Sequence, residues 1–199
     1  MATDNGLDHK IADLISKIQA LEIELEAEIA LRAAELRVAF IDGKVRFEQD
    51  ILRRHRELKI NLWNYLKTSR PLVALTAPII YSLLVPLVLL DLFVTVYQKV
   101  CFPAYGIETV QRGRFFAFDR QYLAYLNMIE KINCAYCSYA NGVIAYAMEV
   151  ASLTEAYWCP IKHARRLQIT HARYLGFADY GDAEGYKKAL LKMNDHIEE

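Results

Sequence analysis

The chain has 199 residues, of which 54% are hydrophobic, and its 24 basic residues balance its 24 acidic residues. A net charge of zero excludes a global electrostatic attraction to nucleic acid or acidic lipid, so any charged partner must be recognised locally. Gly and Pro are scarce, at 8 and 5 residues. A chain so poor in turn residues is expected to consist of long helices, and we therefore predict an all-α protein.

The first ten residues contain acids and a glycine but no apolar core. They lack the features of a secretory signal peptide, so we expect that no N-terminal signal exports the chain. Any insertion into a membrane would then be directed by a later segment.

Residues 1–66 are predicted to form an amphipathic coiled-coil helix, because apolar residues recur there at alternating spacings of three and four. These seam residues are Leu7, Ile11, Leu14, Ile18, Leu21 and Leu25, followed after a four-residue step by Ile29, Ala33, Leu36, Phe40, Gly43 and Phe47. The pattern indicates a homo-oligomer or a partner helix bound through residues 7–52. The alternative is a helical hairpin that turns near Asp42-Gly43 and packs on the rest of the chain.

Residues 67–102 are predicted to be embedded in a lipid bilayer. No charged residue lies between Pro71 and Leu90, and the apolar run continues past Asp91 to Lys99. About twenty apolar residues are enough for a helix to cross a bilayer. A buried core helix would rarely be so long and so apolar.

Two topologies of this segment fit the sequence. Basic residues flank both of its ends, and the positive-inside rule draws both flanks to the cytoplasm. Pro78 and Pro86 lie inside the run, where each removes a backbone donor. These features favour a re-entrant hairpin, with the N-terminal helix and the C-terminal domain on the cytoplasmic side. A single kinked span is the alternative, in which Asp91 must face protein, water or lipid headgroups.

Residues 103–199 are predicted to form a compact helical domain. Its uncharged stretch of residues 132–148 includes asparagine and serine, which indicates a buried helix with polar contacts; a second membrane span is the alternative reading. We expect helices over residues 118–157, 160–175 and 182–193. The second of these would begin at Pro160, because proline is tolerated at the first helical position.

Three of the four cysteines and a histidine form the sharpest motif. Cys134 and Cys137 are spaced C-x-x-C, and Cys159 precedes His163 by four residues. Each pair would share a face of a helix, and two packed helices would bring three thiolates and one imidazole together. That is a tetrahedral ligand set for zinc, or for iron. We therefore predict Cys134, Cys137, Cys159 and His163 as metal ligands.

The same cysteines also fit thiol chemistry. Cys159 would cap the N-terminus of the helix expected at Pro160, where the helix dipole and nearby cations favour the thiolate. Cys134 and Cys137 would then form a reversible disulfide that exchanges with it. A third interpretation treats the cysteines as inert, buried residues. Cys101, at the end of the membrane segment, fits that description best.

The sequence contains no P-loop, no Gly-rich dinucleotide fingerprint, no H-E-x-x-H and no G-x-S-x-G. We therefore favour a membrane-anchored scaffold or sensor that is not an enzyme, with a metal-clamped C-terminal domain and an N-terminal oligomerisation helix, and with no nucleic acid as partner. The first alternative is a membrane-bound thiol oxidoreductase or redox sensor that uses Cys159 with Cys134 and Cys137. The second is a structural coiled-coil membrane protein.

Overall fold

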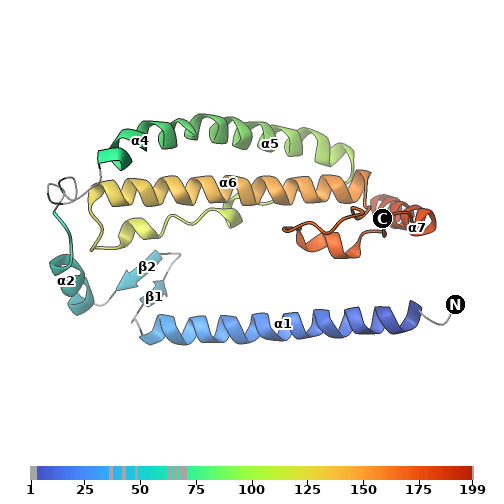
Figure 1. Ribbon diagram of the computed structural model, residues 1–199, viewed down its shortest axis with the longest axis horizontal. Coiled ribbons are helices and arrows are strands. Elements are labelled where there is room, and N and C mark those ends of the chain that lie inside the picture. Colours follow the sequence, from blue (N-terminus) through green and yellow to red (C-terminus); the bar gives the residue numbers. More distant parts are fainter. Residues whose placement is uncertain are drawn as a thin grey trace. The chain divides into compact units, whose positions relative to one another are not determined.

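The computed structural model in Figure 1 describes residues 4–35, 38–41, 44–47, 49–61, 64, 67 and 71–198. The chain divides into two compact units, Met1–Lys59 with Tyr122–Tyr125, and Ile60–Gln121 with Leu126–Glu199. Helices make up most of both units, which confirms the predicted helical class in outline. The predicted membrane segment and most of the predicted C-terminal domain belong to the same unit.

The first unit contains helix α1 (Asp4–Glu35), strands β1 (Val38–Ile41) and β2 (Lys44–Phe47), and helix α2 (Gln49–Glu57). The strands are antiparallel, with Val38 opposite Phe47 and Ile41 opposite Lys44. The prediction of one helix over residues 1–66 is therefore wrong beyond residue 35. Asp-Gly between two runs of β-branched and aromatic residues is a strong hairpin signal, and it outweighs the heptad spacing here. Asp42 and Gly43 themselves lie outside the described residues.

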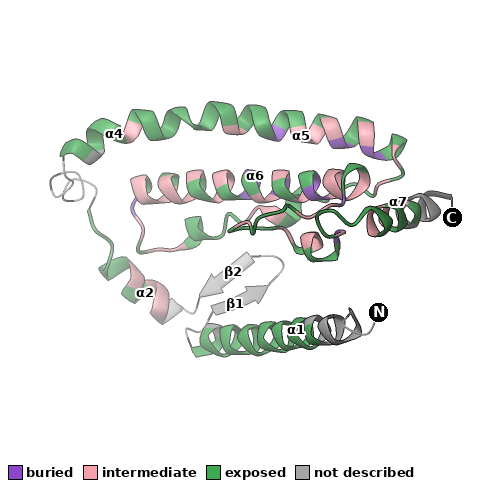
Figure 2. Cartoon of the chain, turned by 45° about the vertical axis from the view of Figure 1, so that its right-hand side comes forward, coloured by how far each residue is buried: buried purple, intermediate pink, exposed green. Residues whose placement is uncertain are grey.

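Helix α1 exposes the seam that was predicted for it. The five seam residues whose side chains the structure describes are 50% to 62% exposed: Leu14, Ile18, Leu21, Leu25 and Ile29. Figure 2 shows this exposure along the described part of the helix. The side chains of Leu7, Ile11, Ala33, Leu36, Phe40, Gly43 and Phe47 lie outside the described set. Coiled-coil pairing of α1 stays a prediction, since it requires a second chain.

The second unit begins with α4 (Pro71–Ser82) and α5 (Leu84–Ala104), which follow one another almost without interruption (Figure 1). Only Leu83 between them is not helical, and Pro86 explains why, because it has no N–H to donate to the carbonyl four residues earlier. The Leu83 N–H bonds to the Ile80 carbonyl and the Leu87 N–H to the Leu83 carbonyl, each at 3.2 Å. These bonds carry the helix through, so the prediction of a re-entrant hairpin within this segment is wrong.

After α5 the chain passes through two short 3-10 helices, η1 (Arg112–Phe115) and η2 (Arg120–Tyr122), before helix α6 (Met128–Trp158). Helix α6 begins later than the predicted residue 118, at a capping box. The Asn127 side chain accepts the Glu130 N–H at 3.0 Å, and the Glu130 carboxylate accepts the Asn127 N–H at 2.8 Å. This reciprocal pair fixes the start of the helix.

The prediction of a helix over residues 160–175 is wrong. That region contains only the 3-10 helix η3 (Ala172–Gly176) and an isolated bridge between Ile161 and Ala178. The Ala178 N–H donates to the Pro160 carbonyl at 2.9 Å, and the Lys162 N–H donates to the Ala178 carbonyl at 2.8 Å. These bonds hold the backbone extended. The chain then closes with α7 (Ala183–Glu198), near the predicted range of 182–193.

The core of the second unit lies where α5, α6 and the segment after α5 meet. Phe102, Tyr146 and Val150 are at most 2% exposed and form its centre. Gly142 of α6 lets that segment approach closely, because a Cβ atom there would lie 2.8 Å from the Phe115 carbonyl oxygen. The packing therefore depends on a glycine within a helix.

Candidate functional site

The combined helix Ala74–Ala104 is the most unusual surface of the described chain. It has 31 residues with a mean hydropathy of 2.4 over its most apolar window, and only 6% of that window is buried. Figure 2 shows α4 and much of α5 as exposed. Large apolar side chains that are 47% to 67% exposed run along one face of α5: Val85, Val88, Leu89, Leu92, Phe93, Val96 and Val100. By length and composition this helix is suited to a membrane.

The opposite face of α5 is polar. Asp91, Thr95, Gln98 and Phe102 recur at helical spacing and point toward α6 and the segment after α5, and all but Thr95 are buried. This face cannot be recognised from the sequence, because its polar residues are few and widely spaced. Helix α5 is therefore amphipathic in an unusual sense, with its few polar groups facing the protein and its apolar groups facing outward.

Asp91 is neutralised by a neighbour from outside the helix. Arg112 donates to it in a bidentate manner, from Nε to Oδ1 at 2.8 Å and from Nη2 to Oδ2 at 2.6 Å. The Tyr139 hydroxyl donates to Oδ2 at 3.0 Å. The guanidinium of Arg112 also lies 4.0 Å from the centre of the Phe116 ring. Burial, together with the hydrogen bond to Asp91, raises the pKa of Tyr139 and keeps its phenol a donor.

The side chain of Gln98 on α5 forms hydrogen bonds that hold the segment after α5 against this helix. Its side-chain oxygen accepts the Val110 N–H at 2.9 Å, and its side-chain nitrogen donates to the Val110 carbonyl at 3.2 Å. The same nitrogen donates to the hydroxyl of buried Tyr146 on α6. One glutamine thus satisfies both backbone groups of Val110 and links three parts of the unit.

The structure does not bring the predicted metal ligands together. Cys134 and Cys137 lie in the first third of α6, whereas Cys159 caps its C-terminal end. At 1.5 Å per residue, Cys137 and Cys159 are about 33 Å apart along one helix. His163 lies beyond the helix, with its ring stacked on Tyr174 at 6.2 Å between centroids. Among the described residues, no group of three or more His, Cys, Asp or Glu side chains is placed to hold a metal ion.

The assumption of two packed helices was therefore incorrect, because Cys134, Cys137 and Cys159 all belong to α6. Cys159 also lies at a helix C-terminus rather than at the predicted N-cap, since its N–H bonds to the Glu155 carbonyl at 2.7 Å. All four cysteines are free thiols, with Cys137 and Cys159 exposed. Binding of zinc or iron by the chain stays a prediction.

A second polar cluster joins η3 and its neighbours to α6. Arg173 pairs with Glu149 at 2.7 Å and donates to the Ser152 hydroxyl at 2.7 Å, and His171 pairs with Glu155 at 2.9 Å. The hydrogen bond from Arg173 lowers the pKa of Glu149 against the opposing effect of burial. No sequence pattern predicts these pairs, because the partners are more than fifteen residues apart and one of each pair lies in an irregular segment. The cluster holds residues 171–177 against the helix.

The comparisons with known proteins add no family to these observations, because no protein-family model, curated protein or solved structure significantly matches the chain.

Proposed function

We propose that this protein is a membrane-bound scaffold, held to a lipid bilayer by α4 and α5 and assembled through α1. The single observation that carries the proposal is the exposed apolar surface of the helix Ala74–Ala104. Soluble monomers rarely expose contiguous apolar patches beyond a few hundred square ångströms. The outer face of this helix exposes a continuous run of large apolar side chains along about 46 Å, at 1.5 Å per residue.

The exposed seam of α1 supports the second part of the proposal. Leu14, Leu21 and Leu25 are each at least half exposed on a helix of 32 residues. Apolar residues at heptad spacing gain burial when a second helix covers them. A second copy of α1, or a helix of a partner, would provide that cover, and the membrane helix would concentrate the chains in two dimensions.

A zinc or iron clamp is not required for this proposal. Within one chain, Cys137 and Cys159 lie near opposite ends of α6, so a clamp would need ligands from a second chain. Elemental analysis of the purified protein tests it, with the double variant Cys134→Ser/Cys159→Ser as the control. One equivalent of metal per chain that is lost in the variant would return the clamp to the proposal. The thiol alternative is weaker than the sequence indicated, because Cys159 is at a helix C-terminus.

Flotation of the full-length chain with liposomes tests the membrane part of the proposal. The wild-type protein should float with the vesicles, and it should stay with them after alkaline carbonate washing. The variant Leu92→Glu/Val96→Glu places two charges on the exposed face of α5 and should stay at the bottom of the gradient. The control Ile169→Glu/Leu175→Glu changes two apolar residues that are 80% and 62% exposed outside that face, and it should float. Recovery of wild-type protein in the soluble fraction without lipid would refute the proposal.

A further inference from the structure

We infer that the helix Ala74–Ala104 lies in the plane of one leaflet and does not cross the bilayer. This inference rests on the proposed function, because it assumes that lipid covers the apolar face of the helix. It replaces both topologies that the sequence suggested.

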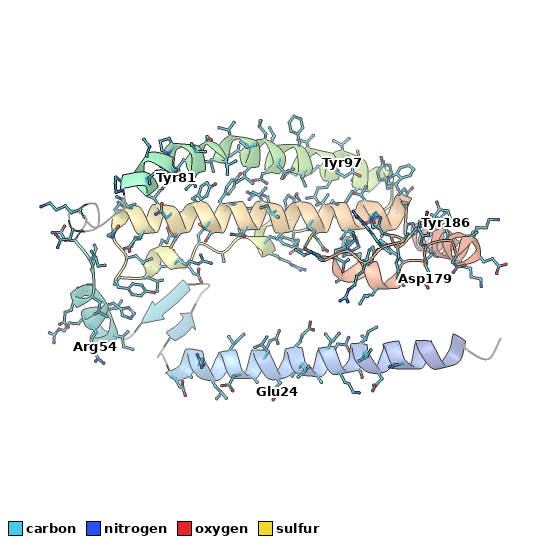
Figure 3. The ribbon with its side chains drawn as sticks, viewed as in Figure 1. Glu24, Arg54, Tyr81, Tyr97, Asp179 and Tyr186 are labelled. Carbon is cyan, nitrogen blue, oxygen red and sulfur yellow. The ribbon has the colours of Figure 1, made fainter. Side chains whose placement is uncertain are left out.

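The combined helix Ala74–Ala104 and helix α6 run parallel to each other. Contacts at three levels show this: Tyr81 with Asn133, Tyr97 with Thr154 at 3.1 Å, and the stacked rings of Tyr105 and Tyr157 at 5.0 Å. Figure 3 labels Tyr81 and Tyr97, which lie on the side of the apolar helix that faces α6. Two parallel helices that are consecutive in the chain require a connection that returns along their full length. Residues 105–127 provide that connection.

The returning segment carries charges at the depth of the middle of the apolar helix. Arg112 binds Asp91, which lies close to the centre of Ala74–Ala104. Further along, Arg120 and Gln121 line a small cleft together with Cys134 and Ser138 of α6. The segment also exposes Glu108, Arg114 and Asp119.

A helix perpendicular to the bilayer would place the Asp91–Arg112 pair near the middle of the hydrocarbon core. Charged side chains are costly there, and irregular backbone exposed to lipid does not occur at that depth. With the helix in the plane of the leaflet, the returning segment lies on the water side of α5. The Asp91–Arg112 pair then lies toward the headgroups, where water and lipid phosphates are available.

The length of the helix points the same way. At 1.5 Å per residue, 31 residues extend about 46 Å, whereas the hydrocarbon core of a bilayer is about 30 Å thick. An in-plane helix has no such upper limit, and its apolar face enters the leaflet by roughly 5–10 Å. Lys99 is exposed beside that face, so its ammonium group can reach the headgroups.

Lipid fits this face better than a second copy of the chain does. Its exposed members are aliphatic apart from Phe93. Interfaces between proteins carry about one hydrogen bond per 100–200 Å² and are enriched in Tyr, Trp and Arg. The polar groups of α5 that would make such bonds, namely Asp91, Thr95 and Gln98, already bind α6 and the returning segment.

Depth-dependent fluorescence quenching by brominated phosphatidylcholine tests the inference in full-length protein whose four native cysteines are replaced. Single cysteines are introduced on the outer face at three levels, Leu75→Cys, Leu89→Cys and Val100→Cys, and labelled with a small fluorophore. Far-UV circular dichroism establishes that each variant is folded. An in-plane helix should give equal quenching depth at all three positions, within one leaflet. A fourth variant, Leu175→Cys, should escape quenching.

Labelling of Arg114→Cys by a water-soluble maleimide in the vesicle-bound protein supplies an independent readout, and the in-plane helix should leave this position reactive. A deep centre with shallow ends, and an unreactive position 114, would overturn the in-plane inference while leaving membrane binding intact. Absence of quenching at all three helix positions would instead overturn the proposed function itself. A chain that dimerises through this face without binding lipid would give that second result.

Discussion

Replacement of Arg112 by methionine should destabilise the second unit, because it leaves the Asp91 carboxylate without its cation. Removing one partner of a fully buried ion pair costs about 3–5 kcal/mol. The Asp91 side chain is only 12% exposed, but that of Arg112 is 42% exposed, so water already screens the pair. We therefore expect a loss of about 1–3 kcal/mol in the free energy of unfolding. Tyr139 still donates to Asp91, which keeps the loss from being larger.

A double-mutant cycle separates this charge effect from lost packing. The double variant Asp91→Leu/Arg112→Met removes both charges, and replacing a buried pair by apolar residues is often neutral. It should therefore be more stable than Arg112→Met alone. The free energy of unfolding would be measured by chemical denaturation in detergent micelles, with Arg114→Met as the matched control at an exposed arginine two residues away. Equal stability of Arg112→Met and Arg114→Met, or a double variant that is less stable than the single one, would refute the reasoning.

Three further predictions concern the packing, the charge cluster and the assembly helix. Gly142→Ala should lower the thermal midpoint, because overpacking costs about 1–3 kcal/mol and outweighs the gain of about 1 kcal/mol in helix propensity. The control is Gly113→Ala, since a Cβ atom at that position would meet nothing within 4 Å. The pKa of Glu149 is lowered in the folded state by Arg173. The contribution of Glu149 to stability is therefore complete above its unfolded pKa of 4.5, and it is lost as the pH falls through the lower pKa of the folded state. The thermal midpoint of Glu149→Gln should depend less on pH below about 5 than that of the wild-type protein. The same dependence of the midpoint on pH in both proteins would contradict this. Leu21→Asp/Leu25→Asp should reduce the oligomer seen by analytical ultracentrifugation, whereas Ile23→Asp, which is exposed but off the seam, should not; equal effects of the two changes would argue against a heptad interface.

Local signals in the sequence account for the elements that were predicted correctly. The apolar helix depends on the composition of residues 71–104, in which only Asp91 and Lys99 are charged, and no distant contact has to supply that composition. The closing helix α7 likewise lies close to the predicted range. The hairpin of β1 and β2 had a local signal as well, in Asp42-Gly43, but the heptad spacing on either side led to a helix prediction.

The side-chain pairs that hold the second unit together are non-local. Asp91 and Arg112 are 21 residues apart, and Glu149 and Arg173 are 24 apart, so no periodicity pairs them. The sequence likewise does not predict that α6 runs parallel to the apolar helix. This direction places the charges of the returning segment beside the middle of that helix. Pro160 is compatible with a helix start, yet its carbonyl bonds to Ala178 and the chain stays extended, which separates His163 from Cys159.

The sequence by itself thus determined that one long segment would be strongly apolar, because hydrophobicity is a property of the residues themselves. Only the tertiary structure decided which face of that helix packs against the protein and which is exposed. The physical reason is that buried polar groups need hydrogen-bond partners, so the contacts of Asp91 and Gln98 with Arg112, Val110 and Tyr146 fix the rotation of the helix about its axis.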